Sequence, residues 1–503
     1  GGLKYLKTYP YDCIEQTVSR FLPNVVSYRA LKELGIANPE LSAQLPQQVA
    51  LAVQKLYALQ NLDGGWGWWP NEKSSPTITA YALLGLTEAQ RAGFIIDQQV
   101  IDLSTAYIYK WLGEDLEESR RLQDTRAMVL YALAEAGQGD LGRTVALYDR
   151  RSDMSLYSEG FLAMALHLLD PKETTRTDAL INEFSDAAIL SATGAHWEEE
   201  YRSPWAMNTD TRSTAIVLRT LVRLKPEHSL LPNAVRWLTT VRNNGRWETT
   251  QENTWAILAL TDYMVSTGEL EADYSYDLLI NDQERASGKV TSDTVEQVVR
   301  SEVPASALRE EDTNVITMSR TDGPGKLYYS AFLRYYLPAD KMRALNRGII
   351  VDRQYYLLDD PEKPVDHASV NDNLVVKLTM IAPNDLHFLV LEDPLPAGCE
   401  AIDTSLKTSR SIEAQPDFVQ VKKPERPYDW WWHRYWPSHT ELRDEKTALF
   451  ATYLPKGTYE YSYQLRCSTA GEFKVLPATA YEMYFADIFG RSAGSVFTIE
   501  AND

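Results

Sequence analysis

Five short segments in the first half of the chain share one apolar pattern, and this repetition constrains the fold most. Apolar side chains recur in them at helical rather than alternating spacing, in residues 80–86, 127–133, 160–166, 215–221 and 254–260. The intervals between the segments are irregular but average about one helical hairpin, which predicts repeated helix pairs from about residue 13 to 267. A closed ring of about six hairpins, an α/α-toroid, fits this length.

Local start and stop signals support this arrangement. Ser75 and Pro76 are typical of an N-cap and a first helical residue. Asp124 is predicted to cap another helix, which stops at Gly137. Residues 60–66 follow the Q-x-x-x-G-x-W pattern that ends helices in α/α-toroids. Tryptophans recur near the predicted loops, at Trp66, Trp68, Trp69, Trp197, Trp205, Trp247 and Trp255.

After Gly268 the pattern changes to a period of two residues, which indicates β-strands. Strands are predicted at residues 277–280, before an Asn-Asp turn, and at 327–337, 374–381, 387–391 and 459–465. Residues 345–503 have the size of one β-sandwich. We therefore predict a multidomain α plus β chain, with a toroid over 1–268, a β segment over 269–344 and an antiparallel β-sandwich over 345–503.

Composition excludes several classes of protein. The 503 residues include 70 acidic and 50 basic side chains, for a net charge of −20, which argues against a nucleic-acid partner. No apolar run approaches the roughly 18 to 20 residues of a membrane span. The first residues do not resemble a signal peptide, so we expect any targeting signal to lie outside this sequence. No metal-binding or cofactor-binding motif appears.

The chain has three cysteines, Cys13, Cys399 and Cys467, and Cys13 stands at the predicted start of a helix. Gln16 follows it three residues later, and at this spacing the two Cβ atoms lie within about 5 to 6 Å. A thiolate there can displace ammonia from the carboxamide and leave a side-chain thioester. The helix N-terminus is expected to stabilise both the thiolate and the oxyanion. For an isolated C-x-x-Q, a buried structural cysteine is the commoner explanation.

The surrounding residues favour the thioester. Residues 8–16, Thr-Tyr-Pro-Tyr-Asp-Cys-Ile-Glu-Gln, and residues 64–70, Gly-Gly-Trp-Gly-Trp-Trp-Pro, resemble the thioester domain of the α2-macroglobulin and complement family in its bacterial form. Residues 247–255, 395–398 and 481–484 are also similar. The resemblance covers essentially the whole chain, as a C-terminal fragment of a larger protein. It implies a thioester domain, a segment completing a CUB-like domain, and a macroglobulin-like sandwich of the receptor-binding type.

This resemblance assigns Cys13 and Gln16 as the thioester cross-link. Asp12 and Ile14 replace two glycines of the animal proteins, which demands a turn that accepts side chains. Complement proteins use a downstream histidine to redirect the reaction to hydroxyls, and residues 127–136 contain none. We therefore predict direct attack by amines, chiefly protein lysines. His167 and His196 are the nearest candidates against this prediction, and packed or surface roles explain both more simply.

The resemblance also implies a shield, because a thioester survives only in a dry enclosure. Tyr9 and Tyr11 flank the site in sequence, and Met483 and Tyr484 correspond to a pair that closes over the thioester in bacterial relatives. The alternative is that Met483 belongs to a strand whose side chains simply fill the sandwich core.

The function implied by the family is a broad-spectrum endopeptidase inhibitor with one reactive thioester per molecule, and not an enzyme. Cleavage of a bait region upstream of this sequence would expose the thioester, which then couples to lysines of the target protease. The implied partners are target proteases and the upstream macroglobulin domains. We expect a periplasmic or extracellular protein, with membrane anchoring through an N-terminal region outside this sequence left open.

Two other functions compete with this one. A toroid also suits an enzyme of the cyclase or glycosidase type; cyclase motifs of the D-x-D-D kind are absent from the toroid segment, but residues 198–200 or Asp210 could supply glycosidase carboxylates. A thioester adhesin would bind host amines without proteolysis.

Some features remain open from sequence. Cys399 and Cys467 could form a disulfide in an oxidising compartment or stay free and buried. Residues 430–436 are rich in tryptophan and are predicted to be a loop that packs against another domain or forms a contact surface. Residues 359–362 are predicted to be a solvated turn.

Overall fold

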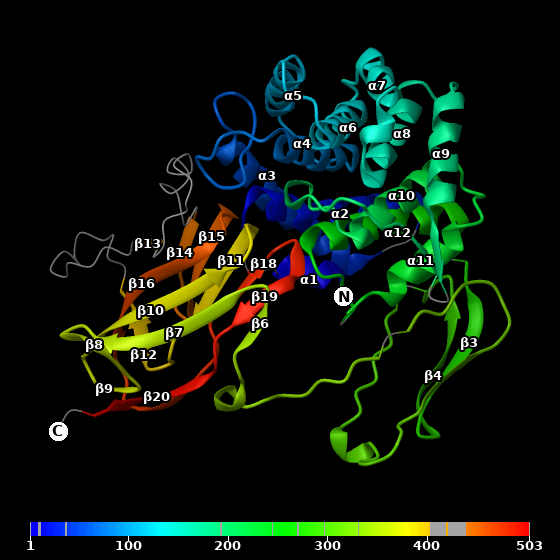
Figure 1. Ribbon diagram of the computed structural model, residues 1–503. Helices are drawn as coiled ribbons and strands as arrows, with labels where there is room; N and C mark the ends of the chain where they lie inside the picture. Colours follow the sequence, from blue (N-terminus) through cyan, green and yellow to red (C-terminus); the bar gives the residue numbers. More distant parts are fainter. Residues whose placement is uncertain are drawn as a thin grey trace.

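The computed structural model describes residues 2–8, 12–35, 38–191, 194–243, 245–268, 271–295, 297–329, 331–402, 419–420 and 439–501. Helices occupy the first half of the chain and strands most of the second (Figure 1). The helices are α1 (Gly2–Thr8), α2 (Ile14–Glu33), α3 (Pro39–Leu59), α4 (Pro76–Arg91), α5 (Gln98–Leu112), α6 (Arg120–Glu135), α7 (Leu141–Tyr148), α8 (Leu156–Leu169), α9 (Thr175–Ala187), α10 (Asp210–Leu224), α11 (Leu231–Thr240) and α12 (Thr250–Thr267).

The even-numbered helices form a closed ring. Each of α2, α4, α6, α8, α10 and α12 packs against the next, and α12 packs back against α2. These six helices form the inner layer of the toroid. The odd-numbered helices α3 to α11 form the outer layer, and each packs against the inner helix that precedes or follows it in sequence. Because each outer helix returns the chain to the same end of the ring, the N-termini of all inner helices lie at that end. This arrangement confirms the predicted α/α-toroid.

Three buried tryptophans repeat one contact between the layers of the ring. In each, the indole Nε1–H donates to a carbonyl in the last turn of an outer helix, where backbone acceptors lack helical partners. The bonds join Trp66 to Leu56 (2.8 Å), Trp197 to Phe184 (2.7 Å) and Trp247 to Leu238 (2.9 Å). The recurrent tryptophans of the sequence thus fasten the outer helices to the loops that follow them.

The two predicted helix caps had different outcomes. Ser75 caps α4 and accepts from the Ile78 N–H, as predicted. The prediction for Asp124 was wrong, because α6 starts four residues earlier behind the cap Ser119. Asp124 instead accepts from the N–H (2.9 Å) and hydroxyl (2.7 Å) of Ser155, so it caps the start of the neighbouring inner helix α8. Its partner is remote in sequence, which local pattern cannot reveal.

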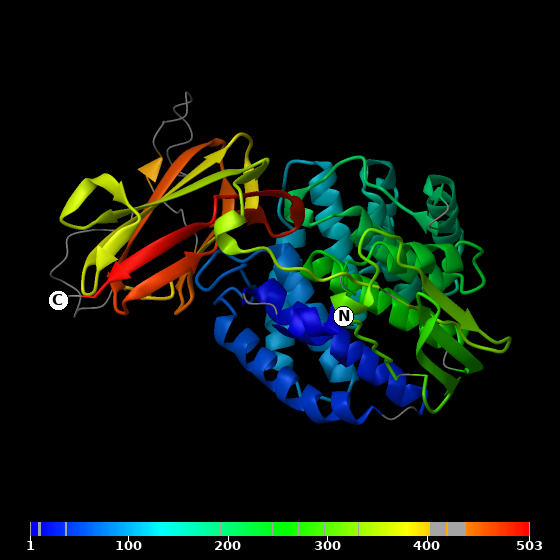
Figure 2. The same ribbon diagram turned by 90° about the horizontal axis from the view of Figure 1, so that it is seen from below.

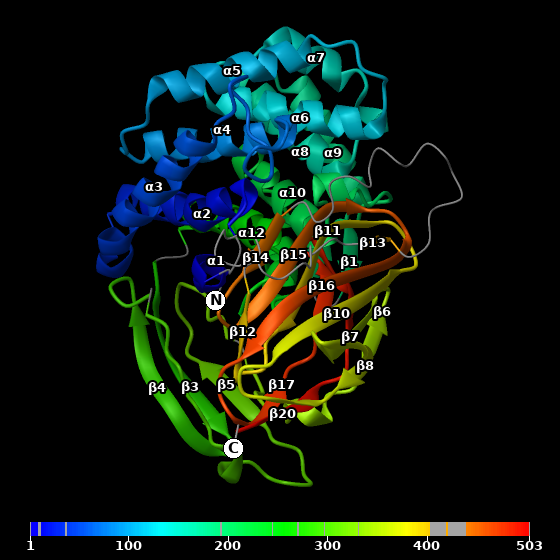
Figure 3. The ribbon, with the colours of Figure 1, turned by 90° about the vertical axis from the view of Figure 1, so that its left-hand side faces the viewer.

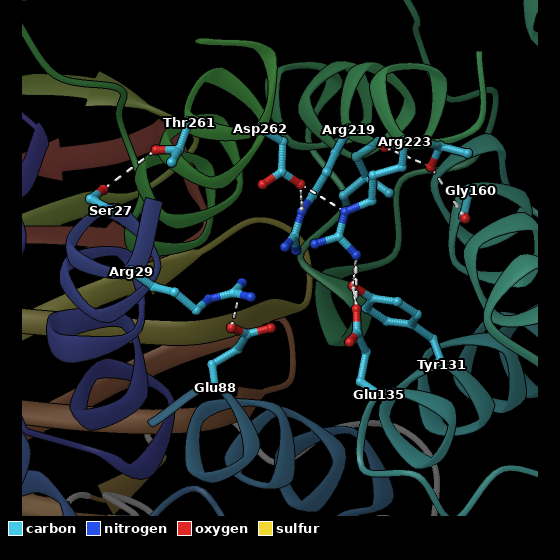
Figure 4. A network of polar contacts seen from close by, with 12 residues as sticks. Ser27, Arg29, Glu88, Tyr131, Glu135, Gly160, Arg219, Arg223, Thr261 and Asp262 are labelled. Atoms are coloured by element: carbon cyan, nitrogen blue, oxygen red, sulfur yellow. Dashed lines mark hydrogen bonds and ion pairs between the residues drawn. The ribbon is translucent and has the colours of Figure 1, made fainter. Parts of the chain in front are cut away.

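A network of charged side chains closes the other end of the ring (Figure 4). Asp262 Oδ2 accepts from the Nε atoms of Arg219 (2.9 Å) and Arg223 (2.7 Å). Arg223 Nη1 also donates to Glu135 Oε1 at 2.9 Å, and Tyr131 donates to the same oxygen at 2.7 Å. These arginines lie near helix C-termini, where positive charge is favourable. Burial raises the pKa of Glu135, but Arg223, Arg91 and Arg219 lower it to about 2.

The strands are β1 (Ile189–Ser191), β2 (Gly194–His196), β3 (Asp273–Ile280), β4 (Gln283–Thr291), β5 (Ile316–Arg320), β6 (Leu345–Arg347), β7 (Ile350–Leu357), β8 (Asp360–Val365), β9 (His367–Ser369), β10 (Asn373–Ala382), β11 (Leu386–Pro394), β12 (Cys399–Ala401), β13 (Val419–Gln420), β14 (His439–Leu442), β15 (Lys446–Leu454), β16 (Gly457–Cys467), β17 (Gly471–Val475), β18 (Thr479–Glu482), β19 (Phe485–Arg491) and β20 (Ser495–Glu500).

The segment after the toroid forms a small antiparallel sheet in the order β4-β3-β5. Its β3–β4 hairpin turns at Asn281 and Asp282, both at positive φ, as the sequence predicts. The strand predicted at 327–337 was wrong: the described residues of this segment form no strand. Tyr329 and Tyr336 are 65% and 84% exposed, and no described strand pairs with the segment, so its alternating pattern has no sheet to join.

The C-terminal half is a β-sandwich of two six-stranded sheets, in the orders β12-β16-β10-β7-β8, with β13 beside β16, and β14-β15-β11-β18-β19-β6. A third, three-stranded sheet has the order β17-β20-β9. Strands β10, β11 and β16 confirm the strands predicted at 374–381, 387–391 and 459–465. The alternating side chains Tyr459, Tyr461, Tyr463 and Leu465 of β16 are buried in the core, as predicted for one buried face. Residues 359–362 end the β7–β8 turn and begin the exposed strand β8. Residues 430–436 lie outside the described residues.

The sandwich and the toroid lie side by side (Figure 2). In Figure 3, which views the molecule from the sandwich side, β11, β14 and β15 lie in front of the helical ring. Strand β11 contacts the short helix Pro204–Ala206 of the toroid. One buried apolar cluster continues from the toroid into the sandwich and includes Phe388, Phe450, Met483 and Tyr484. Within the described part of the chain, every helix is either too short or too polar to cross a membrane.

Cys399 and Cys467 face each other directly on the neighbouring strands β12 and β16. Both are buried, and their Sγ atoms lie 3.8 Å apart as free thiols. A disulfide needs these sulfurs to approach further and fixes strand β12 beside β16.

We predict that a mild two-electron thiol oxidant such as diamide joins Cys399 to Cys467 in the Cys13→Ser variant purified in its reduced form. The protein should lose both titratable thiols as a monomer and gain about 2 to 4 kcal/mol of stability. Thiol titration, non-reducing electrophoresis and urea unfolding measure this. Two thiols that survive oxidation, or that form dimers, would contradict the prediction.

Candidate functional site

Cys13 is the N-cap of α2, at the end of the ring where the inner helices begin. Its side chain and that of Gln16 are 2% and 1% exposed. The Ile14 N–H, in the first turn of α2, donates to the Trp68 carbonyl at 3.0 Å, so the tryptophan-rich loop lies directly over the start of the helix. The predicted position of Cys13 at a helix start is therefore confirmed.

Cys13 and Gln16 are paired across the first turn. The Cys13 N–H donates to Gln16 Oε1 at 3.2 Å, and the Gln16 backbone N–H is directed to the Cys13 sulfur. Gln16 Nε2 is buried without a hydrogen-bond partner among the described residues. A buried unpaired amide costs about 1 to 3 kcal/mol, and loss of this nitrogen as ammonia would remove the cost. The Cys13 N–H is also placed to stabilise negative charge on Gln16 Oε1.

A small apolar pocket adjoins Cys13 at the boundary between the toroid and the sandwich. The toroid contributes the loop after α3, and the sandwich contributes β11, β15 and the turn between β18 and β19. Its lining residues are Cys13, Trp68, Trp69, Phe388, Leu389, Phe450, Ala451, Thr452, Met483 and Tyr484.

The aromatic side chains Trp68, Trp69, Phe388, Phe450 and Tyr484 of this lining form a cover over Cys13. Phe388 is the central side chain of this cover. Its ring centroid lies 4.3 Å from that of Trp68, 5.2 Å from Tyr484 and 5.4 Å from Trp205. Its backbone is at φ +50°, unusual for a bulky residue. Phe388 and Thr452, the residue opposite it, are both left out of the pairing of β11 with β15, although the register is the same on either side. The ladder is therefore interrupted at Phe388, and its ring packs against Trp68 and Trp205 of the toroid. The sequence shows only a residue within a strand, so this role was missed.

Glu72 holds the tryptophan loop against the sandwich. Its Oε2 accepts from the backbone N–H groups of Trp68 and Trp69, both at 3.2 Å, and Thr452 donates to its Oε1 at 3.4 Å. Burial raises the pKa of this carboxyl, and these hydrogen bonds oppose the rise. The Trp69 ring also stacks on His439 at 4.4 Å. The loop is thus positioned by contacts from both domains.

Met483 and Tyr484 occupy the turn between β18 and β19 and face Cys13 across the pocket. The Met483 N–H donates to the Phe388 carbonyl at 3.0 Å. The Tyr484 hydroxyl donates to Glu15 Oε2 at 2.9 Å. The structure therefore brings this pair to Cys13 and does not place it in the sandwich core. Tyr9 and Tyr11 lie outside the described residues.

The electrostatics of Cys13 differ from the expectation. Burial, followed by the nearby Glu15 carboxylate, raises the pKa of the Cys13 thiol well above its ordinary value. The Gln16 backbone N–H and the Lys55 ammonium lower it, but less strongly. The predicted stabilisation of a thiolate by the helix N-terminus is thus outweighed, because a buried anion loses its hydration.

Neither histidine considered from sequence has a role at this pocket. His196 stacks on Trp237 and pairs with Glu198 on the small β1–β2 sheet. His167 is half-buried in the last turn of α8. The histidines beside the cover, His387 and His439, belong to the sandwich and pack on Trp205 and Trp69.

The carboxylates considered for a glycosidase serve other contacts. Glu199 accepts from the N–H groups of Leu156 (3.1 Å) and Tyr157 (3.0 Å) and so caps α8. Asp210 accepts from the Glu199 N–H and pairs with Arg202. Among the described residues, no group of three or more histidine, cysteine, aspartate or glutamate side chains is arranged to hold a metal ion.

Comparisons with known proteins agree with this geometry. Residues 1–129 match the family model "A-macroglobulin TED domain", and residues 348–487 match "Bacterial Alpha-2-macroglobulin MG10 domain". Together the two matches cover more than half of the chain. An α2-macroglobulin homologue of Nostoc sp. is 24% identical over 90% of this chain, which spans 24% of that protein. The chain thus spans about a quarter of the length of this curated relative.

Two solved structures share the fold. Native α2-macroglobulin of Escherichia coli, from domain MG7 to the C-terminus, has a TM-score of 0.70 at 18% identity, over 99% of this chain and 75% of that one. Salmonella α2-macroglobulin reacted with methylamine has a TM-score of 0.69 at 18% identity, over 99% of this chain and 30% of that one. The chain belongs to the α2-macroglobulin family. It corresponds to the TED and MG10 regions of the bacterial proteins.

Glu159 is a buried carboxyl group in the first turn of α8, the helix that Glu199 caps, and it gives a prediction for stability. Burial, followed by Glu183 and Glu199, raises its pKa to about 8 from an ordinary 4.5. Between these values the unfolded chain has released the proton that the folded chain keeps, so stability falls as the pH rises from about 4.5 to about 8. Glu159→Gln should remove part of this fall. Urea unfolding across this range measures it, and parallel curves for the two proteins would contradict the prediction.

Proposed function

We propose that Cys13 and Gln16 form an intramolecular thioester and that this chain is the reactive part of a protease trap. The observation that carries the proposal is the first turn of α2, where the two side chains are fully buried and paired while Gln16 Nε2 lacks a partner among the described residues. The aromatic cover supports it, because a thioester needs protection from water.

The proposed chemistry proceeds in two balanced steps. In the first, the Cys13 sulfur attacks Gln16 Cδ, and ammonia leaves with the Nε2 nitrogen and the thiol proton. In the second, the amine of a protein lysine attacks the same carbon. The C–S bond breaks, an amide forms at Gln16, and the proton lost by the amine ends on Cys13 as a free thiol. The Cys13 N–H beside Oε1 would stabilise the charged intermediate of both steps.

Burial accounts for the stability of the closed site. An attack that expels Cys13 creates a thiolate, and the surroundings of Cys13 raise the pKa of its thiol, so the sulfur is a poor leaving group while the cover is in place. Separation of the sandwich from the toroid would hydrate the sulfur and admit an amine at the same time. Domain movement can therefore control both access and reactivity.

The family relationship supports a trap for proteases. Relatives are named α2-macroglobulins, and the Salmonella protein has been solved after reaction with methylamine, a small amine. In the proposal, cleavage of a bait region outside this sequence releases the sandwich, and the exposed thioester couples to lysines of broadly varied endopeptidases. The protein acts once and is not an enzyme. We place it in the periplasm or outside the cell, where it meets such proteases.

The exposed segment 327–337 supports partners in a longer protein. No described strand pairs with this segment, and its large side chains Phe332 and Leu333 are 53% and 77% exposed. Among the described strands, the outer strands β4 and β5 of the sheet β4-β3-β5 each pair only with β3. We assign this region to a CUB-like domain that is completed by chain outside this sequence, next to the upstream macroglobulin domains. Unpaired edges and apolar side chains are the expected signs of a missing half.

A thioester adhesin is the second candidate, since the same site would couple to host amines. The two differ in their trigger. In the full-length protein, labelling of lysines that depends on proteolysis supports the trap. Labelling of host surfaces without proteolysis supports the adhesin.

Methylamine incorporation tests the proposed chemistry in this chain. We expect one methylamine at Gln16 by peptide mapping and one new titratable thiol at Cys13, with none of either in the Cys13→Ser variant. Incorporation at other glutamines, or equal labelling of Cys13→Ser, would contradict a thioester at this site.

Tyr484→Ala tests the shield. Removal of the Tyr484 phenol opens the pocket beside Cys13 but does not touch the ring of helices, so the fold should persist. Spontaneous loss of the thioester should become about tenfold faster or more. Circular dichroism checks the fold, and thiol release over time measures the loss. Tyr461→Phe, a buried tyrosine of the sandwich remote from the pocket lining, is the control. An unchanged lifetime for Tyr484→Ala would exclude the shielding role.

A further inference from the structure

Glu15 lies between Cys13 and Gln16 in sequence, and its carboxylate connects the two domains. We propose that Glu15 is the positioning residue that holds the cover of the sandwich against the thioester turn. The inference rests on the proposed function and adds to it the group that receives the sandwich.

The toroid holds the carboxylate from two inner helices. Ser19 in α2 donates to Oε1 at 2.6 Å. From α12, Gln251 Nε2 donates to Oε1 at 2.7 Å, and the Thr250 hydroxyl lies 3.0 and 2.9 Å from the two oxygens. These donors fix the carboxylate where the ring closes, because α2 and α12 are the first and last inner helices. The toroid alone therefore supplies three donors to this carboxyl group.

The sandwich supplies one further donor, the hydroxyl of Tyr484, at 2.9 Å from Oε2. Tyr484 is 1% exposed and lies 469 residues from Glu15 in sequence. Its ring also contacts Trp68 and Phe388, at centroid distances of 5.7 and 5.2 Å. The hydrogen bond therefore sets the depth and direction at which the ring enters the pocket, whereas ring contacts alone would allow it to slide.

The buried position makes this contact matter. Glu15 is 0% exposed, and burial raises its pKa while its hydrogen bonds lower it. The buried Arg212 faces the same region and donates to Gln251 Oε1 at 3.2 Å, so the arginine and the carboxylate are joined through one amide. Tyr81 lies 2.8 Å from the Ser19 hydroxyl on the other side. Hydrogen bonds to a buried carboxyl group are costly to lose, because water cannot replace them there.

Departure of the sandwich would remove this donor and admit water to a carboxylate that adjoins Gln16 in the first turn. Because Glu15 directly precedes Gln16 in the chain, a change in the contacts of Glu15 when the sandwich leaves can alter the thioester turn. No comparable connection is available to Met483, whose described polar contact stays within the sandwich, at the Phe388 carbonyl.

The test is a double-mutant cycle on the rate of methylamine incorporation. Glu15→Gln and Tyr484→Phe should each accelerate incorporation by about tenfold or more, since each removes the hydrogen bond or its charge. The double variant should be no faster than the faster single variant, because both changes break one contact. Accelerations that multiply in the double variant, or a Glu15→Gln rate equal to wild type, would overturn this inference alone.

Controls separate positioning from general loss of stability. Glu252→Gln alters another buried carboxylate in the same region, which caps α12 through the Glu248 and Thr249 N–H groups, and should not accelerate incorporation. If Glu15→Gln fails to fold, Thr250→Val takes its place in the cycle. Thr250→Val should accelerate methylamine incorporation in the wild-type protein but not in the Tyr484→Phe variant. An equal acceleration in both would overturn the inference. Wild-type protein that incorporates no methylamine would overturn the proposed function, and this inference with it.

Discussion

Burial of the first turn of α2 under the turn between β18 and β19 is the contact on which the rest of the account depends. It covers Cys13 and Gln16, deprives the sulfur of hydration and places Tyr484 against Glu15. Each effect has the same physical origin, the exclusion of water by a second domain. A reactive group that is stable only in this state can be controlled by moving the domain away.

Closure of the helical ring makes this contact possible. Because the inner helices all begin at one end, the N-terminus of α2, the loop after α3 and the start of α12 lie together there. The tryptophan contacts and the helix caps are concentrated in the same loops, so the segments that form the site are also those that fasten the ring. The charged network involving Arg219, Arg223 and Asp262 closes the opposite end (Figure 4).

Much of this arrangement could be predicted from sequence, because it follows from local periodicity and spacing. The helical repeats predict the ring, the alternating tyrosines of β16 predict a sandwich strand, and the spacing of Cys13 and Gln16 predicts their pairing. Contacts between segments remote in sequence could not be found in this way. Asp124 caps a different helix, Phe388 lies where the ladder between β11 and β15 is interrupted, and Glu15 receives a donor 469 residues away. The strand predicted at 327–337 was wrong for a related reason. Periodicity shows that a segment can form a strand but not that a partner strand is present.

The central claim is that Cys13 is bonded to Gln16 in the native protein, and the intact mass under mild, non-reducing conditions tests it most directly. The account predicts a mass below that of the sequence by one ammonia, with no such deficit in the Cys13→Ser variant. A native mass equal to that of the sequence, together with a free Cys13 thiol in freshly purified protein, would contradict it.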